Sequence, residues 1–281
     1  MLVRHSHIDT FLQAAQVYLE KDEALNNLML GIALRIQRDP NFYQRVEMFT
    51  LNEGADQILA ALVTVPEKLI IYSTKGITAA AVEQLVLELL EQEINVPGVI
   101  GPKKLAEQFA AVWSAHTGCS VQLAMHMGVY ELRQVNEEVI GEGSLRPVKR
   151  GDLDLLTRWI AGFHTDTGLI NIDMELCRAL AKRRIAESSA FFWEHQGTPV
   201  SVAAQSRPTL NGITINMVYT PREYRGRGYA TSCVASLSQQ LLHSGYKFCA
   251  LFTDLANPTP NKIYRDIGYR YIRDFGDYRF S

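Results

Sequence analysis

The sequence predicts an α/β protein in which two units, each with helices packed on a mixed sheet, follow one another along the chain. Its 281 residues, 47% of them hydrophobic and 21% charged, are enough for two domain cores and exclude a disordered or low-complexity chain. Hydrophobic periodicity gives both halves the same order: two helices, three strands, then helix, strand, helix and strand. The charge balance is −7 over residues 1–140 and +5 over 141–281, within a net charge of −2. This split predicts two bodies, of which the basic one suits a small anionic ligand.

In the first half, the clearest element is an amphipathic helix with Val82, Leu85, Val86, Leu89 and Leu90 on one face. The turn at Asp39-Pro40-Asn41 ends an earlier helix. The predicted helices span residues 8–19, 23–38, 78–92 and 103–113. The predicted strands span residues 43–50, 57–65, 68–72, 96–100 and 121–132.

A polar stretch over residues 136–143 predicts a linker, so the domains are expected at 1–135 and 144–281. In the second domain, Gln196-Gly197 and Asn211-Gly212 are typical hairpin turns. Asn257-Pro258 is a typical helix start. The predicted helices span residues 153–161, 174–186, 230–241 and one that begins at 258. The predicted strands span residues 145–148, 190–194, 200–206, 213–219, 248–252, 269–272 and 278–280.

Several function classes are not expected. No apolar run approaches the roughly 20 residues of a transmembrane helix, and the first residues lack a signal-peptide pattern. The near-neutral charge argues against general binding to nucleic acid or membrane. The scattered cysteines form no CxxC pair, which favours free thiols in a reducing, cytoplasmic compartment and no metal site. These cysteines are Cys119, Cys177, Cys233 and Cys249.

The residues that most clearly indicate chemistry are Arg225-Gly226-Arg227-Gly228, between a predicted strand and a predicted helix. The first backbone N–H groups of a helix lack intrahelical partners and lie at the positive end of its dipole. The glycines allow the backbone to approach an anion closely, and arginine suits phosphate oxygens. The segment therefore predicts a pyrophosphate cradle, although its spacing fits neither a Walker loop nor a dinucleotide fingerprint.

The run Arg225-x-x-Gly228-x-Ala230 resembles the Arg/Gln-x-x-Gly-x-Gly/Ala signature of the GCN5-related N-acetyltransferases (GNAT family). Residues 254–269, with Asn257 and Tyr264, resemble a later segment of that family, and residues 145–152 resemble its opening strand and turn. The resemblance covers residues 144–281 and implies two tandem GNAT-like folds. The first is degenerate, because residues 72–78 hold one glycine and no arginine.

The resemblance implies acetyl-CoA as co-substrate. Met217, Val218 and Tyr219 would present backbone groups to the acetyl and pantetheine arm. Asn257 would bond that arm, and Tyr264 would lie beside the sulfur as the acid for the leaving thiolate. The pyrophosphate would be held by Arg225, Gly226, Arg227, Gly228, Tyr229, Ala230 and Thr231.

The implied function is direct transfer of the acetyl group to a primary amine of an unidentified small-molecule or peptide acceptor. The alternatives are a non-catalytic acyl-CoA-binding or regulatory module, and transfer of a longer acyl group. The first half is expected to form a wall of the acceptor pocket or an oligomer contact, such as that of a homodimer. The general base stays open between a water chain and five side chains, Glu194, His195, Glu223, Asp254 and His164.

Overall fold

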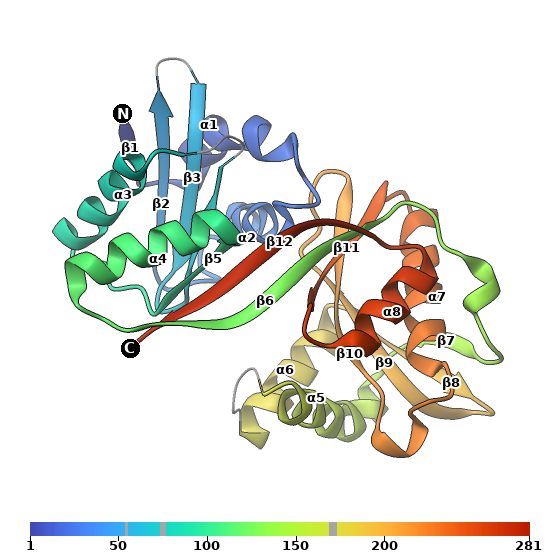
Figure 1. Ribbon diagram of the computed structural model, residues 1–281. Helices are drawn as coiled ribbons and strands as arrows, with labels where there is room; N and C mark the ends of the chain where they lie inside the picture. Colours follow the sequence, from blue (N-terminus) through green and yellow to red (C-terminus); the bar gives the residue numbers. More distant parts are fainter. Residues whose placement is uncertain (54–55, 74–76, 169–172) are drawn as a thin grey trace. The chain divides into compact units, whose positions relative to one another are not determined.

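The computed structural model describes residues 1–53, 56–73, 77–168 and 173–281, and these form two compact units (Figure 1). Unit 1 holds Met1–Tyr130, Phe252–Asn257 and Tyr271–Ser281. Unit 2 holds Glu131–Leu251 and Pro258–Arg270. The end of the chain therefore groups with its beginning, while the boundaries drawn from the sequence at 135 and 144 stay a prediction.

Unit 1 is a mixed sheet with a pair of helices on each face. Its strand order is β1-β2-β3-β4-β5-β12-β6, with β4 parallel to β5 and β12 antiparallel to β5. The strands are β1 (Leu2–His5), β2 (Val46–Glu53), β3 (Asp56–Thr64), β4 (Leu69–Tyr72), β5 (Gly98–Pro102), β6 (Val121–Leu132) and β12 (Arg270–Phe280). The helices are α1 (Ile8–Glu20), α2 (Asn27–Arg38), α3 (Ala79–Glu91) and α4 (Lys103–Thr117).

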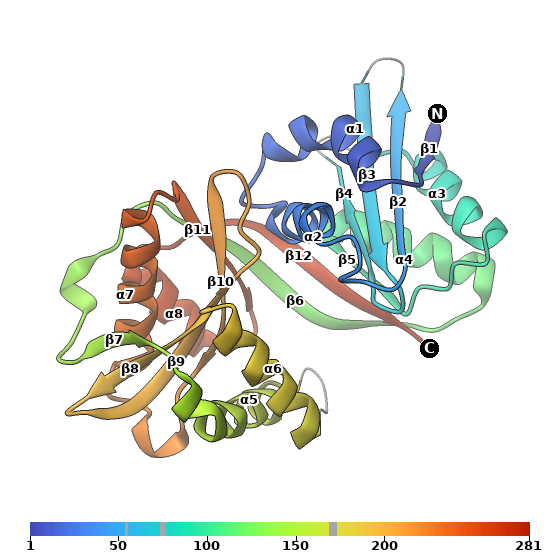
Figure 2. The ribbon, with the colours of Figure 1, turned by 180° about the vertical axis from the view of Figure 1, so that it is seen from behind.

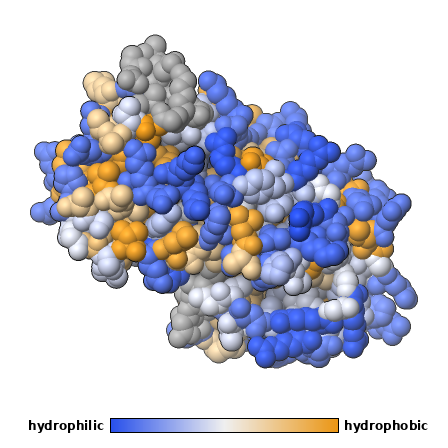
Figure 3. All heavy atoms as spheres, viewed as in Figure 1, coloured by the Kyte–Doolittle hydropathy of each residue, from blue (hydrophilic) through white to orange (hydrophobic). Residues whose placement is uncertain are grey.

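Alternating side chains of this sheet supply two separate cores. On β2, Phe49 packs with α3 and α4, whereas its neighbour Met48 packs with α1 and α2. Accordingly, α3 and α4 lie in front of the sheet in Figure 1, and α1 and α2 lie in front of it in Figure 2. Leu90, expected on the apolar face of α3, is 36% exposed, and other large hydrophobic side chains such as Leu87 of α3 and Leu123 of β6 are exposed as well. In Figure 3 hydrophobic residues are scattered over the part of the face where α3 and α4 lie.

The C-terminal strand differs from the prediction. The sequence predicts two short strands at 269–272 and 278–280, but one strand, β12, runs from Arg270 to Phe280. It pairs with β5 from Phe275 opposite Pro102 to Arg279 opposite Gly98. Strand pairing overrides the weak β-propensity of the polar residues between, such as Asp277, whose carboxylate pairs with Lys68. Two smaller differences are that β1 was not predicted and that α2 begins at Asn27 instead of residue 23.

Unit 2 has the strand order β11-β10-β9-β8-β7. Its helices α5 and α6 pack on the face of the sheet nearest the viewer in Figure 2, and α7 contacts β8, β9 and β10. The strands are β7 (Ser144–Pro147), β8 (Ala190–His195), β9 (Thr198–Ser206), β10 (Gly212–Tyr219) and β11 (Phe248–Asp254). The helices are α5 (Leu153–Thr167), α6 (Met174–Ala186), α7 (Tyr229–His243) and α8 (Pro258–Ile267).

The element order of the first half recurs in the second. β1 to β6 and β7 to β12 both follow the sequence strand, two helices, three strands, helix, strand, helix and strand. The duplicated fold predicted from hydrophobic periodicity is therefore confirmed. The four cysteines are free, and all but Cys119 are buried. Within the described ranges, no helix has the length and apolar character needed to cross a membrane.

Candidate functional site

The strand β10 carries a bulge where the acetyl arm is expected. Asn216 pairs with Ala204 of β9, but the next pair is Tyr219 with Val202, so β10 has one residue more than its partner. Met217 has a φ of 50°, which is uncommon for a residue other than glycine. A bulge of this kind takes backbone groups out of the ladder. The structure thus places irregular backbone at two of the residues predicted to present backbone groups, Met217 and Val218.

The bulge also lies where β10 and β11 part. The two strands run parallel, and their register extends from Gly212 opposite Phe248 to Thr214 opposite Ala250. Among the residues that the structure describes, this register does not continue past Thr214. Ile215, Asn216 and Tyr219 therefore pair with β9 on one side, and the described register with β11 does not reach them on the other.

The predicted cradle forms the start of α7. Gly226 and Gly228 have φ values of 74° and 77°, and a Cβ at either would meet no atom within 4 Å. These glycines therefore serve the backbone conformation, not close packing. Gly228 is the N-cap of α7, no side chain caps the helix, and its first turn holds no acidic residue. The N–H groups of Tyr229, Ala230 and Thr231 thus lie at an uncapped, positive helix end that suits an anion.

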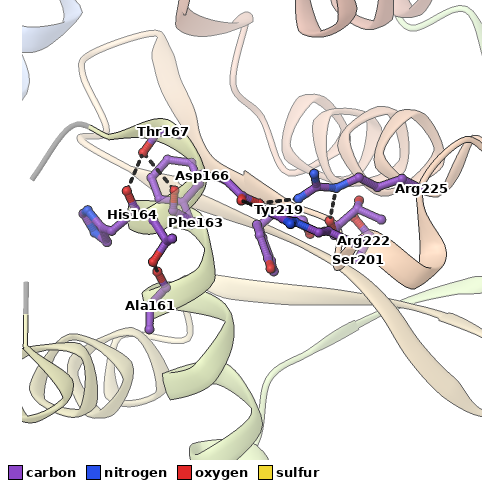
Figure 4. Close-up of polar contacts among 11 residues, drawn as sticks. Ala161, Phe163, His164, Asp166, Thr167, Ser201, Tyr219, Arg222 and Arg225 are labelled. Carbon is purple, nitrogen blue, oxygen red and sulfur yellow. Dashed lines mark hydrogen bonds and ion pairs between the residues drawn. The ribbon is translucent and has the colours of Figure 1, made fainter. Parts of the chain in front are cut away.

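Arg225 and Arg227, both predicted to hold the pyrophosphate, lie in different surroundings. The Nε of Arg225 donates to the carbonyl oxygen of Thr220 at 2.8 Å, and its guanidinium pairs with Asp166 of α5. Arg222 reaches the same carboxylate at 3.2 Å, so Asp166 ties the loop to α5 (Figure 4). Arg227 is exposed, and no described residue pairs with it. Arg227 thus offers an exposed positive charge beside the start of α7, and Arg222 and Arg225 share the single carboxylate of Asp166.

The hydrogen bond from Arg225 also lowers the pKa of the Asp166 carboxyl below its usual range. No local motif predicts this contact, because α5 and the loop are more than fifty residues apart in the sequence. A second contact between α5 and this region is the close packing of α5 on β10. A Cβ at Gly162 would lie 2.4 Å from the hydroxyl oxygen of Tyr219. The loop, the bulge and the last turns of α5 therefore form one connected cluster.

Tyr264 lies on the buried face of α8. Its side chain is 8% exposed, and its ring meets that of Tyr269 edge to face at 5.8 Å between centroids. In the described part of the chain no group hydrogen-bonds to its hydroxyl. Burial raises the pKa of Tyr264 to about 12. The phenol is therefore protonated at neutral pH and is a hydrogen-bond donor.

Asn257 lies on the segment Phe252–Asn257, which groups with unit 1, directly before α8 begins at Pro258. Its backbone N–H donates to the carbonyl oxygen of Asp254 at 3.1 Å. This turn at the start of α8 agrees with the helix start predicted there. The contact of Asn257 with acetyl-CoA stays a prediction.

A cavity of about 200 Å³ lies beside the bulge. Three elements of unit 2 contribute its walls: α5, α6 and β10. The lining residues are Ile160, Phe163, His164, Leu180, Arg184, Asn216 and Met217. Met217 belongs both to the bulge and to the cavity wall.

The five side chains considered as general base differ in their contacts. Glu194 accepts from Arg146 at 2.6 Å, and Nδ1 of His195 is 3.2 Å from the carbonyl oxygen of Glu142. Glu223 is exposed in the turn Arg222–Tyr224, and the carboxylate of Asp254 accepts from the N–H of Ala256 at 2.9 Å.

His164 is the candidate that lines the cavity beside the bulge. Its Nδ1 is buried and has no hydrogen-bond partner among the described residues. In Figure 4 its ring points away from the cluster of Asp166 and Arg225. Burial lowers the pKa of His164, so the imidazole is neutral at pH 7. Arg184 and Asn216, which also line the cavity, were not predicted, because neither belongs to a local motif.

Known proteins share this architecture. Residues 196–279 match the FR47-like protein family. A GNAT-family acetyltransferase from Colwellia psychrerythraea is 11% identical, with a TM-score of 0.58 and full coverage of both chains. A GCN5-related N-acetyltransferase from Sphaerobacter thermophilus is 13% identical, with a TM-score of 0.67 over 99% of this chain and 95% of that one. A Drosophila protein is 12% identical, with a TM-score of 0.68 over 100% and 98%.

A search of the curated proteins finds no match. At these low identities the solved structures establish the fold, which extends over both halves of the chain. The match to the FR47-like family covers the cradle, the bulge and α8. The resemblance that the loop motif carries is therefore confirmed: the chain has the GNAT acetyltransferase fold over its whole length.

Proposed function

We propose that the chain is an N-acetyltransferase that moves the acetyl group of acetyl-CoA directly to a primary amine. The observation that carries the proposal is the order of features within unit 2: a bulged strand leads through a glycine-rich loop to an uncapped helix N-terminus. The FR47-like match over the same residues supports it. Free thiols and the use of acetyl-CoA fit a cytoplasmic location.

The residues present fit acetyl-CoA. Its pyrophosphate is an anion, and the start of α7 offers free N–H groups, two glycines with positive φ and the exposed Arg227. Acetyl-CoA supplies the thioester that the amine attacks. Backbone N–H groups at Met217 and Val218 would donate to the oxyanion that forms as the carbonyl carbon becomes tetrahedral.

Tyr264 acts at the leaving sulfur in this proposal, but as a hydrogen-bond donor. A phenol with a pKa of about 12 is a weaker acid than a thiol with a pKa of about 8.5. Complete transfer of the proton from the phenol of Tyr264 to the thiolate of CoA therefore costs about 5 kcal/mol. The proton that the thiolate finally takes comes from the amine nitrogen, which becomes acidic once its bond to carbon has formed. Tyr264 thus stabilises the thiolate without losing its proton.

The rival is a non-catalytic acyl-CoA-binding module, which the lack of a carboxylate on β10 favours. Titration calorimetry with CoA and acetyl-CoA measures binding, and release of free thiol across a panel of amines measures turnover. We expect both, with release of one thiol for each amide formed. Binding without amine-dependent thiol release would support the module instead. A panel of acyl-CoA chain lengths separates acetyl transfer from transfer of longer groups.

A further inference from the structure

The cavity of about 200 Å³ in unit 2 is placed to hold the group that attacks the thioester. Met217 forms part of its wall and is also the bulge residue at which the acetyl group is expected. The remaining walls come from the last turns of α5 and from α6. A molecule in this cavity is therefore next to the proposed reaction centre.

The walls are mainly apolar. Ile160, Phe163, Leu180 and Met217 surround the space, and no acidic side chain is among the lining residues described. An apolar wall favours an apolar body in the ligand, because burying it removes hydrophobic surface from water. The small volume restricts that body to a small molecule.

Among the lining residues described, the side chain that carries a permanent charge is Arg184. Arg184 lies on the wall, where its guanidinium donates to the carbonyl oxygen of Gln205 at 2.9 Å and to Oδ1 of Asn216 at 3.2 Å. The amide of Asn216 in turn donates to Ser206 at 2.8 Å, which fixes its direction. The reacting nitrogen of a monoamine loses its charge when it gives its proton to His164, whereas a second ammonium group would stay charged and desolvated beside Arg184, with no acidic side chain among the lining residues described. The cavity therefore disfavours diamines and polyamines.

His164 is the cavity residue that accepts a proton. Arg184 of α6 lines the same cavity as His164, and Asp166 of the same helix as His164 is engaged by Arg222 and Arg225. Strand β10 contributes the uncharged Asn216 and Met217. A neutral imidazole in these surroundings is a base for a bound ammonium group.

We infer that this cavity is the acceptor site, that it takes a small apolar monoamine, and that His164 is the general base. The inference rests on the proposed acetyl transfer. The ammonium gives one proton to His164, and the nitrogen lone pair forms the C–N bond. The C–S bond then breaks, and a second proton from nitrogen reaches the thiolate. The balance is ammonium plus acetyl-CoA to amide, free CoA and one proton, which His164 releases to water.

The acceptor class is tested with a matched pair, pentylamine and 1,5-diaminopentane, which differ in the second ammonium group. We expect kcat/KM for pentylamine to be at least about tenfold higher, since each tenfold needs only 1.4 kcal/mol of discrimination. Arg184→Gln removes the positive charge from the wall, so it should raise kcat/KM for the diamine and lower the ratio of the two kcat/KM values. Equal rates with the wild type, or faster turnover of the diamine, would overturn the acceptor class.

The base is tested with ethylamine and 2,2,2-trifluoroethylamine, because the second amine is largely unprotonated at pH 7. His164→Ala should lower kcat/KM for ethylamine about 10²–10⁴-fold and affect trifluoroethylamine far less. Added imidazole should restore part of the ethylamine rate. Equal losses with both amines and no rescue would show that His164 only shapes the site.

Calorimetry with acetyl-CoA, run beside the rate measurements, distinguishes failure of the proposed acetyl transfer from failure of the base assignment. If the wild type binds acetyl-CoA but turns over no amine, the proposed function fails. If the wild type turns over amines and His164→Ala is as active, the base assignment alone fails. The control is Phe163→Leu, which trims the same wall without removing a titratable group and should change KM more than kcat.

Discussion

The two units of the molecule share an element order but differ at the point where a strand passes into a helix. In unit 2, β10 is bulged at Met217, and the N-cap of α7 is Gly228, which has no side chain to cap the helix. In unit 1, β4 pairs with β3 without a shift, and the N-cap of α3 is Thr78, whose Oγ1 accepts from the N–H of Ala81 at 3.3 Å. A hydroxyl thus takes one of the helix-end N–H groups that unit 2 leaves for an anion.

The units also differ on the side of the sheet where unit 2 has its cavity. In unit 1 the end of β4 carries Tyr72, which is buried, meets Tyr18 of α1 edge to face and donates to Asp22. Burial, with the hydrogen bond to Asp22, raises the pKa of Tyr72. An aromatic ring between the helices and the strand excludes a ligand of the kind proposed for unit 2. Among the described residues, unit 1 therefore shares the element order of unit 2 but has a regularly paired strand end and a buried tyrosine where unit 2 has a bulge and a cavity.

The largest effect is expected at Gly228. Gly228→Val forces a branched side chain into a φ of 77° and moves the first N–H groups of α7, so acetyl-CoA affinity measured by calorimetry should fall at least about 100-fold. The matched control is Gly118→Val, because Gly118 has a φ of 73° and equally open surroundings at the end of α4. Both variants should lose stability. Loss of affinity in both alike would mean that strain, not the cradle, is responsible.

The next effect is at Tyr264. Tyr264→Phe removes a hydrogen bond to a developing thiolate, a contact to a charged group that contributes about 1.5–3 kcal/mol, so kcat should fall roughly 10- to 100-fold. The affinity for acetyl-CoA should stay within about twofold. Tyr269→Phe is the control, because its hydroxyl lies 2.9 Å from Ser238 and supports packing instead. An unchanged kcat in Tyr264→Phe would reject its place at the sulfur.

These expectations show which parts of the molecule are predictable from the sequence. The cradle was predictable because its glycines and its helix start are adjacent in the chain, and α6 was predicted over its observed range, Met174–Ala186. The single strand β12 was not, because its pairing with β5 joins residues more than 170 positions apart. The same is true of the contact between Arg225 and Asp166 and of the cavity at His164. Local patterns give elements and caps, whereas pairing and cavities depend on tertiary contacts.

A smaller effect is expected at Asp166, the residue that ties the unit 2 loop to α5. Its pKa is lowered in the folded state, chiefly by the hydrogen bond from Arg225, so the pair stabilises the fold above the unfolded pKa of about 3.8. That contribution is lost as pH falls through the lower, folded value. The pair is partly exposed, so Asp166→Asn should cost less than about 1 kcal/mol at pH 7. Urea unfolding of the wild type and of Asp166→Asn should show a smaller difference in unfolding free energy at pH 2.5 than at pH 7.

The smallest effect tests whether unit 1 binds the same ligand as unit 2. The sequence predicts that it does not, although residues 74–76 of the corresponding loop lie outside the described residues. Unit 1 has a cavity of about 730 Å³ with Lys103 and Lys104 at the start of α4 on its wall. These lysines provide positive charge, but β4 of this unit pairs with β3 without the bulge that β10 has.

Replacing Lys103 and Lys104 together by alanine should therefore change acetyl-CoA affinity less than about twofold and leave a stoichiometry of one acetyl-CoA per chain. Arg227→Ala is the matched change in unit 2, since it also removes exposed positive charge, and it should weaken binding by roughly tenfold. If the wild type bound two acetyl-CoA molecules per chain and the lysine variant bound one, unit 1 would be a binding site as well. In that case unit 1 would bind acetyl-CoA without catalysis. The cap at Thr78 and the buried ring of Tyr72 would then distinguish a binding unit from a catalytic unit, and not a unit without a site from a unit with one.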